Sequence, residues 1–355
     1  MSIPVLNIYH MLTYSWRSLD QAEKVMVEHA DRHDLLNLLA AVLTTAVNRL
    51  VKRGLNGNYL LQTEEINGVK GKFEVGPTVK TLAHRRLKAV CTYDEFSKDI
   101  LLNRIIVSVL FKLLGIREIE PDIHARIKSL IWHFAGIRPF VVESKDFKRI
   151  KLGRNEKHYR FVMSICRLLV DHLLPSEKPG EYFFDDFVRD ERKMNSLFES
   201  FVRNFYRYKL CELWEVKRES IYWQFEDLSG TDKNYLPSMQ TDITISDLTR
   251  KVIIDTKYYS KTLTEYYDSE KLHSTNLYQL FAYLLNQESA VEVPSLSASG
   301  MLLYANTNKD LIQCYRYKSH HIHIRTIDLF KPWQEVEADL MRIWTEVSER
   351  KMKIH

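Results

Sequence analysis

The sequence predicts a mixed α/β protein, α+β in character, with a helical N-terminal half and a C-terminal half built around a mixed sheet. Apolar residues recur at helical spacing through most of the first half, whereas the second half has one long helix followed by short strand-like runs. Between the two halves lies Pro175–Gly180 (PSEKPG), which combines two prolines, a glycine and charged residues. The predicted domains are therefore residues 1–178 and 179–355.

The first half is predicted to hold several helices around one short β segment. The clearest helix covers Asp34–Arg53, with Asp34 as a candidate N-cap and Gly54 directly after its basic end. A β-hairpin is expected between Tyr59 and Val79, because Asn67-Gly68 is a strong hairpin-turn signal. Further helices are expected over residues 98–114 and 161–174.

The second half is predicted to begin with a long helix over Glu191–Leu213. Five short runs then have strand character: SIYWQFE, TDITIS, KVIIDTKYY, GMLLYA and HIHIRTIDL. A helix over Ser274–Leu285 separates the third run from the fourth. This order predicts a mixed sheet flanked by helices.

Composition sets broad limits on function. With 45% hydrophobic and 27% charged residues among 355, the chain is typical of a globular protein rather than a disordered one. Its net charge of +5 permits a nucleic-acid partner without requiring one. The four cysteines form no CxxC pair, so a zinc site is not expected and a reducing compartment is favoured. Because signal-peptide features and long apolar runs are not apparent, a cytoplasmic location is expected.

Two acids and a lysine in neighbouring strand-like runs are the candidate catalytic residues. If the runs containing Asp242 and Asp255 form a hairpin with these acids opposite each other, Thr244 lies opposite Ile253 and a four-residue loop closes the turn. Asp255 and Lys257 are two residues apart on one strand, so their side chains project from the same face. The three charged groups are therefore expected to converge at one end of the sheet.

Metal-assisted phosphodiester hydrolysis is the chemistry that this group favours. Buried carboxylates need a compensating cation, and Mg²⁺ prefers such hard oxygen ligands, so Asp242 and Asp255 are the expected metal ligands. A bound metal activates water and neutralises charge on a phosphate, while Lys257 can stabilise the transition state. The alternative is an exposed salt bridge on an ordinary hairpin, because the spacing alone is common.

Three further residues are candidates for supporting roles. Glu199 lies on the predicted helix before the sheet and either faces the same site or is a solvated carboxylate. Gln279 and Tyr283 are one helical turn apart, so they either contact DNA, brace the site or pack in the core. Four histidines lack acid partners at ligand spacing and are interpreted as structural or surface residues: His273, His320, His321 and His323.

The arrangement Asp242…Asp255-x-Lys257, followed by Gln279-x-x-x-Tyr283, resembles the PD-(D/E)xK nuclease superfamily in its RecB-like variant. Thr241 stands where the superfamily name implies proline, a position at which proline is often absent. The segments NIYHMLTYSW, DEFSKDILLNRII, LPSMQTDITI, DTKYY and STNLYQLFAYL occur in the order typical of the McrC family. That family comprises the nuclease subunits of McrBC systems, which restrict DNA containing modified cytosine.

The resemblance implies that Asp242, Asp255 and Lys257 form a nuclease site that uses Mg²⁺. It also implies a partner, an McrB-like AAA+ GTPase hexamer that recognises modified cytosine in double-stranded DNA. The N-terminal half is expected to dock into that ring and to stimulate GTP hydrolysis. This chain has no GxxxxGK[ST] loop, so GTP is expected to bind the partner only.

Which N-terminal element enters the ring stays open at this point. Asn67–Lys72 and the basic stretch Lys80–Lys88 are candidates, although any loop of this composition can be exposed surface. Two other functions also compete with the leading one, namely a non-catalytic activator of a GTPase and a stand-alone repair nuclease. The modified base, its sequence context, the cleavage pattern and the oligomeric state are not readable from the sequence.

Overall fold

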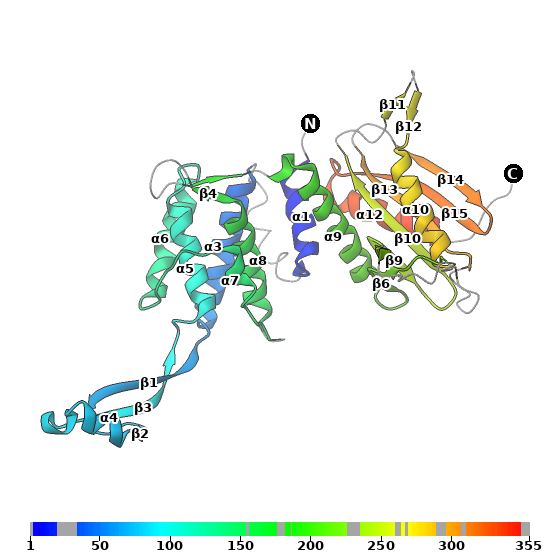
Figure 1. Ribbon diagram of the computed structural model, residues 1–355. Helices are drawn as coiled ribbons and strands as arrows, with labels where there is room; N and C mark the ends of the chain where they lie inside the picture. The colour runs from blue at the N-terminus through cyan, green and yellow to red at the C-terminus, as the bar shows by residue number, and fades with distance from the viewer. Residues whose placement is uncertain are drawn as a thin grey trace. The chain divides into compact units, whose positions relative to one another are not determined.

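The chain folds into two compact units, formed by residues 20–185 and by residues 1–19 together with 186–355. The computed structural model (Figure 1) describes residues 3–19, 34–153, 156–175, 182–185, 187–225, 235–259, 264–266, 269–288, 296–306 and 310–348. The proposed boundary residues 176–180 lie outside this set. The helix α1 (Val5–Ser15) belongs to the unit that contains the large sheet, since it lies against the helix α9 (Glu191–Lys209). The predicted division at residue 178 stays a prediction.

The first unit is mainly helical. Its helices are α3 (Leu35–Arg53), α4 (Val75–Lys80), α5 (Leu101–Leu114), α6 (Pro121–Ile131), α7 (Ser144–Phe147) and α8 (Lys157–His172), with 3₁₀ turns at Ala83–Arg86 and Trp132–Phe134. The helix α3 begins as predicted, because the Asp34 side chain accepts a hydrogen bond from the backbone N–H of Asn37. It ends as predicted at Gly54, whose φ is +91°.

The helix α3 is the central helix of this unit. It is the one helix among the described residues that is long and apolar enough to cross a membrane. However, 72% of its most apolar stretch is buried inside the protein. The helices α6 and α8 both lie against it. Its apolar composition therefore follows from a core position within the unit.

A three-stranded sheet extends from one end of these helices (Figure 1). Its strands are β1 (Asn58–Asn67), β2 (Lys72–Phe73) and β3 (Lys88–Ser97), in the order β1-β3-β2. The predicted hairpin between Tyr59 and Val79 is therefore wrong, because β1 pairs along its whole length with β3, from Asn58 opposite Ser97 to Asn67 opposite Lys88.

The Asn67-Gly68 signal marks a real change of direction but not a closed hairpin. Gly68 has a φ of +92° and Gly71 a φ of +70°. At Gly71 an added Cβ would lie 2.6 Å from the carbonyl oxygen of Thr92, so the chain passes β3 closely and places β2 on its other edge. The basic stretch that follows holds α4 and a 3₁₀ turn before β3 begins at Lys88.

A mixed six-stranded sheet organises the second unit, as the sequence predicted. The strands are β6 (Glu215–Lys217), β9 (Ile243–Ser246), β10 (Lys251–Tyr258), β13 (Ser299–Asn306), β14 (Ile312–Tyr317) and β15 (His320–Asp328), in the order β14-β15-β13-β10-β9-β6. The pairs β10–β13 and β13–β15 are parallel, and the other neighbours are antiparallel.

Two-stranded pairs elsewhere are β4 (Leu173–Pro175) with β5 (Tyr182–Phe184), β7 (Ser220–Ile221) with β8 (Met239–Gln240), and β11 (Thr264–Tyr266) with β12 (Ser269–Lys271).

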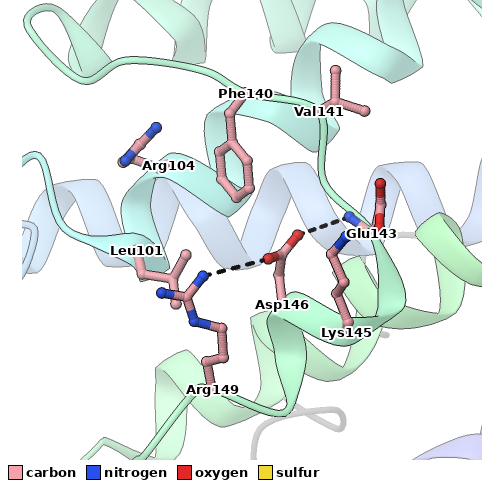
Figure 2. Close-up of a pocket in the computed structure, with 8 residues that line it drawn as sticks. All are labelled: Leu101, Arg104, Phe140, Val141, Glu143, Lys145, Asp146 and Arg149. Atoms are coloured by element: carbon pink, nitrogen blue, oxygen red, sulfur yellow. Dashed lines mark hydrogen bonds and ion pairs between the residues drawn. The ribbon is translucent and has the colours of Figure 1, made fainter.

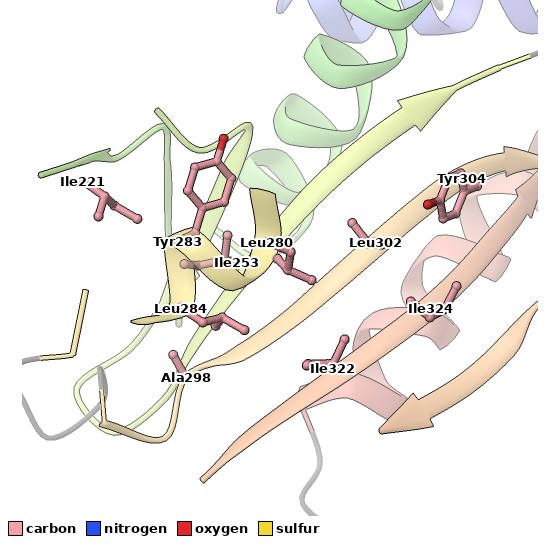
Figure 3. Packing of buried hydrophobic residues seen from close by; sticks show 10 residues of the cluster. All are labelled: Ile221, Ile253, Leu280, Tyr283, Leu284, Ala298, Leu302, Tyr304, Ile322 and Ile324. Carbon is pink, nitrogen blue, oxygen red and sulfur yellow. The ribbon is translucent and has the colours of Figure 1, made fainter. Parts of the chain in front are cut away.

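Helices cover both faces of this sheet. The helix α10 (Ser274–Asn286) buries Leu280 and Leu284 against sheet residues that include Ile253 and Leu302 (Figure 3). Gly300 of β13 allows this close approach, because an added Cβ would lie 2.9 Å from Leu280. On the other face lie α9 and α12 (Trp333–Ser348), which are joined by the Tyr206 hydroxyl donating to the Leu340 carbonyl at 3.0 Å.

The face of β15 that contacts α12 contains a buried histidine whose protonation is unfavourable. Burial lowers the pKa of His323 to about 4, and the neighbouring charges of Arg325 and His321 act in the same direction. The folded state therefore favours neutral His323, so stability is expected to fall as the pH drops from about 6.5 towards 4.

Replacing His323 with leucine is expected to remove about 2 kcal/mol of the acid-induced loss in unfolding free energy near pH 5. Chemical denaturation of wild type and variant across this pH range measures the difference. The exposed His133 offers a matched substitution as control. Parallel pH profiles for wild type and the His323 variant would refute this explanation.

Candidate active site

The β9–β10 hairpin brings the predicted acids to one end of the sheet. Its register places Thr244 opposite Ile253 and Ser246 opposite Lys251, as predicted from the sequence. The four-residue loop is closed by Asp247, whose Oδ1 accepts hydrogen bonds from the backbone N–H groups of Thr249 and Arg250 at 2.7 and 2.6 Å. Asp242 directly precedes β9, so the same register continues to bring it level with Asp255.

Asp255 is fully buried in β10, with an exposed fraction of 0%. Neither of its carboxylate oxygens accepts a hydrogen bond from a described residue. The ammonium of Lys257 lies 2.8 Å from Oδ2 and forms an ion pair with it. Burial and the nearby charge of Asp242 raise the pKa of Asp255 to about 7, although Lys257 opposes the shift. Ionisation of this buried carboxylate is therefore unfavourable despite its ion pair with Lys257.

Asp242 is fixed at the end of the hairpin by the next residue of β10. Its Oδ2 accepts hydrogen bonds from the backbone N–H of Thr256 at 2.9 Å and from the Thr256 hydroxyl at 3.0 Å. The fully buried Thr241 is held in turn by the main chain of Glu219, to which its N–H donates at 2.9 Å. Asp242 is thus positioned by Thr256 of β10, while the residue before it is held by the main chain of Glu219, between β6 and β7.

Lys257 is held between Asp255 and the helix α10. Its ammonium donates to Gln279 Oε1 at 3.1 Å, Gln279 donates to the Tyr283 hydroxyl at 2.7 Å, and this hydroxyl donates to the Gln240 carbonyl at 2.9 Å. Burial alone would lower the pKa of Lys257, but the Asp255 carboxylate raises it above its ordinary value. Lys257 is therefore a charged, oriented donor, and Gln279 and Tyr283 are placed to position it.

Glu199 lies on α9 near the same end of the sheet and forms ion pairs with two arginines. Its Oε1 lies 2.6 Å from Nη1 of Arg203 and 2.5 Å from Nη2 of Arg218. Arg203 also donates to the carbonyl of Asp242 at 3.3 Å. The sequence interpretation missed both arginines, although Glu199 and Arg203 have the four-residue spacing typical of helical ion pairs. Arg218 is far from Glu199 in sequence, and no local pattern points to it.

The four histidines lie outside this cluster of charged residues. His273 is the N-cap residue of α10 and lies against the Tyr259 ring, with the ring centroids 4.8 Å apart. His320 is buried between the Ala298 carbonyl at 2.8 Å and the Glu288 carboxylate at 2.7 Å. Among the described residues, His, Cys, Asp and Glu side chains form no group of three or more that would enclose a metal ion.

A separate cavity of about 370 Å³ lies in the helical unit between α5 and α7. Its polar groups serve local structure (Figure 2), because Asp146 accepts a hydrogen bond from the N–H of Glu143 at 3.0 Å and caps α7. Arg149 also lies 3.9 Å from Asp146, and the Arg104 guanidinium lies over the Phe140 ring. The ionisable groups lining this cavity are thus occupied, and it is not a second candidate active site.

A mixed sheet flanked by helices, with two acids and a lysine at the end of a hairpin, defines the second unit as a nuclease-like α/β unit. Residues 7–305 match the model of the family described as "McrBC 5-methylcytosine restriction system component". The chain belongs to this family.

A curated relative supports the same family membership, and a solved structure shows the same fold. The Type IV methyl-directed restriction enzyme EcoKMcrBC of Escherichia coli (strain K12) is 33% identical over 346 residues, covering 97% of this chain and 98% of the relative. The fold is similar to a chain in the half-complex of Thermococcus gammatolerans McrB AAA+ hexamers with bound McrC. That match has a TM-score of 0.62 and 18% identity, covering 97% of this chain and 76% of the other.

Proposed function

We propose that this chain is the Mg²⁺-dependent DNA endonuclease subunit of a restriction complex directed at modified cytosine. The observation that carries the proposal is the buried carboxylate of Asp255, which lies beside Asp242 and Lys257 and accepts no hydrogen bond from a described residue. A structural salt bridge does not require a second carboxylate beside the buried pair. The arrangement instead fits a site that receives a divalent cation and a phosphodiester.

Asp242 and Asp255 are the residues that would hold Mg²⁺. The two oxygens of Asp255 offer hard ligands without competing hydrogen bonds, and Asp242 retains Oδ1 beside its hydrogen-bonded Oδ2. The small number of protein ligands fits Mg²⁺, which keeps several waters in its coordination shell. When bound, the ion would lower the pKa of a water and neutralise charge on the phosphate.

The other residues of the site orient and stabilise the reacting groups. Lys257 is held as an ammonium by Asp255 and Gln279, so its positive charge is in place before charge develops on the phosphate. Gln279 and Tyr283 fix that ammonium from α10. Arg203 holds the backbone of Asp242, so the spacing of the two acids is maintained by α9.

The partner and the substrate are proposed from the relatives. The solved structure with the same fold contains McrC bound to McrB AAA+ hexamers, and the Escherichia coli relative is named as a methyl-directed restriction enzyme. We infer that this chain joins an McrB-like GTPase hexamer, stimulates its GTP hydrolysis and cuts double-stranded DNA with modified cytosine. The three-stranded sheet of the helical unit is the proposed docking element. The complex is proposed to be cytoplasmic.

The test is a cleavage assay with the full chain, its partner GTPase, GTP and Mg²⁺. Methylated duplex is expected to be cut, whereas unmethylated duplex, omission of GTP, or EDTA is expected to abolish cleavage. Replacement of Mg²⁺ by Ca²⁺ is also expected to abolish it, because Ca²⁺ favours looser geometry with more ligands. Undiminished cutting in EDTA would contradict the metal-dependent mechanism.

A further inference from the structure

A cluster of arginines extends from the candidate site along α9. Its members, named here the arginine track, are Arg17, Arg203, Arg207 and Arg218. They come from three segments: the end of α1, the helix α9, and the connection after β6. Arg203 and Arg207 are one helical turn apart, about 6 Å along the helix axis.

The track is built from two pairs of guanidinium groups, each sharing one acceptor atom. Arg203 and Arg218 converge on Glu199 Oε1. Arg17 and Arg207 converge on Asn204 Oδ1, at 3.2 and 3.4 Å.

The second pair lacks a carboxylate partner among the described residues. Arg17 and Arg207 form no ion pair with a carboxylate in the part of the chain that the structure describes. Burial lowers the pKa of Arg207, and the nearby positive charges of Arg17 and Arg203 act in the same direction. Among nearby acids, Glu215 is engaged by Lys217 at 2.8 Å, and Glu212 is exposed.

The backbone conformation of Arg17 independently indicates that an arginine side chain is needed at this position. Arg17 has a φ of +53°, in the left-handed region that favours glycine. Its N–H donates to the Tyr14 carbonyl at 3.0 Å and the next N–H, of Ser18, donates to the Thr13 carbonyl at 3.2 Å, which is the usual helix-ending motif. Glycine would serve this turn with less strain, but it would remove the guanidinium from the track.

We propose that the arginine track binds phosphates of the DNA backbone and guides the duplex to the nuclease site. This inference rests on the proposed function. The track is continuous with that site, because Arg203 donates to the carbonyl of Asp242. Each guanidinium has five N–H donors and uses only some of them in the contacts described, so donors are left for phosphate oxygens. An excess of positive charge beside a nuclease site complements the polyanion that the site must receive.

The experiment measures binding of the full chain to a synthetic DNA duplex in EDTA, so that no cleavage occurs, at increasing salt concentrations. Arg17→Gln, Arg207→Gln and Arg218→Gln are each expected to weaken binding by about three- to tenfold and to reduce the salt slope by about 0.9. The control is Arg316→Gln on the edge strand β14, at the opposite edge of the sheet from β6, which is expected to change neither quantity.

Equal slopes for wild type and all three track variants would overturn the proposal, as would an equal loss in the Arg316 control. Loss of partner binding with normal DNA binding would also overturn it, because the track would then be a protein contact. Arg218 and Arg17 are the most informative positions, since both are exposed and their replacement leaves the main-chain contact of Arg207 with Val216 in place. Because DNA binding is measured without cleavage, failure of the proposed nuclease function gives a different result: no cutting by wild type, with the track effects still present.

Discussion

Replacing Asp255 with asparagine is expected to abolish DNA cleavage and, at the same time, to make the protein more stable. Cleavage should fall by about a thousandfold or more, because the charge stabilisation that a metal ion provides is worth several kcal/mol. Stability should rise because burial and Asp242 disfavour the charged form of Asp255 more than Lys257 favours it, so a neutral side chain removes a net cost. Few substitutions away from an active site combine these two effects.

The direction of the pKa shift of Asp255 determines how the stability gain of Asp255→Asn depends on pH. The pKa of Asp255 is raised from 3.8 to about 7, so the folded state binds the proton more tightly than the unfolded state. Wild-type stability therefore falls as the pH rises from about 4 through 7. The melting temperature of Asp255→Asn is expected to exceed that of wild type by several degrees near pH 8 without added metal, and the difference should vanish near pH 4.

Added Mg²⁺ provides a second measurement on the same variant. It is expected to raise the melting temperature of wild type, because a ligand that binds the folded state stabilises it, and to leave Asp255→Asn nearly unchanged. Asp247→Asn is the matched control, because Asp247 lies at the other end of the same hairpin and its pKa is held low: burial opposes this, but hydrogen bonds from Thr249 and Arg250 prevail. This control is expected to lose some stability and to cut normally. A destabilised Asp255→Asn protein would show that the carboxylate is structural.

The candidate site could be predicted from the sequence because its geometry depends on residues that are close together in the chain. The alternation of side chains in a strand and the length of the Asp247–Arg250 loop together determine the register, which the structure confirms at Thr244 and Ile253. The exposed salt bridge that competed with a catalytic interpretation required Asp255 to be accessible, and its complete burial argues against that alternative. The roles of Asp242, Asp255 and Lys257 themselves stay a prediction.

Features that depend on distant parts of the chain could not be predicted in the same way. The Asn67-Gly68 turn signal is local, but the strand that pairs with β1 begins only at Lys88, after α4 and a 3₁₀ turn. Likewise, the two arginines on Glu199 come from one helical turn away and from the connection after β6. A local pattern predicts that a turn forms, whereas the choice of partner strand or ion pair depends on packing that sequence spacing does not encode.

Removing the three-stranded sheet of the helical unit is expected to abolish stimulation of the partner GTPase. Asn58 and Ser97 are register partners at the base of β1 and β3, so residues 59–96 can be replaced by a two-residue Asn-Gly turn that joins these two ends. The segment 59–96 carries large apolar side chains that are exposed, among them Tyr59 of β1 at 71% and Leu87, just before β3, at 89%. In the assembly proposed above, a partner surface would cover such residues.

The truncated chain is expected to fold, because the helices α3, α5, α6 and α8 contact one another within the unit. Its melting temperature should stay within a few degrees of wild type, while GTP turnover by the partner should return to the rate without this chain. Replacing His84, Arg85 and Arg86 together with glutamine tests whether the exposed basic turn accounts for the effect within an intact sheet. Full GTPase stimulation by the truncated chain would place the docking element elsewhere, and it would leave the assignment of the nuclease residues unaffected, since those lie in the other unit.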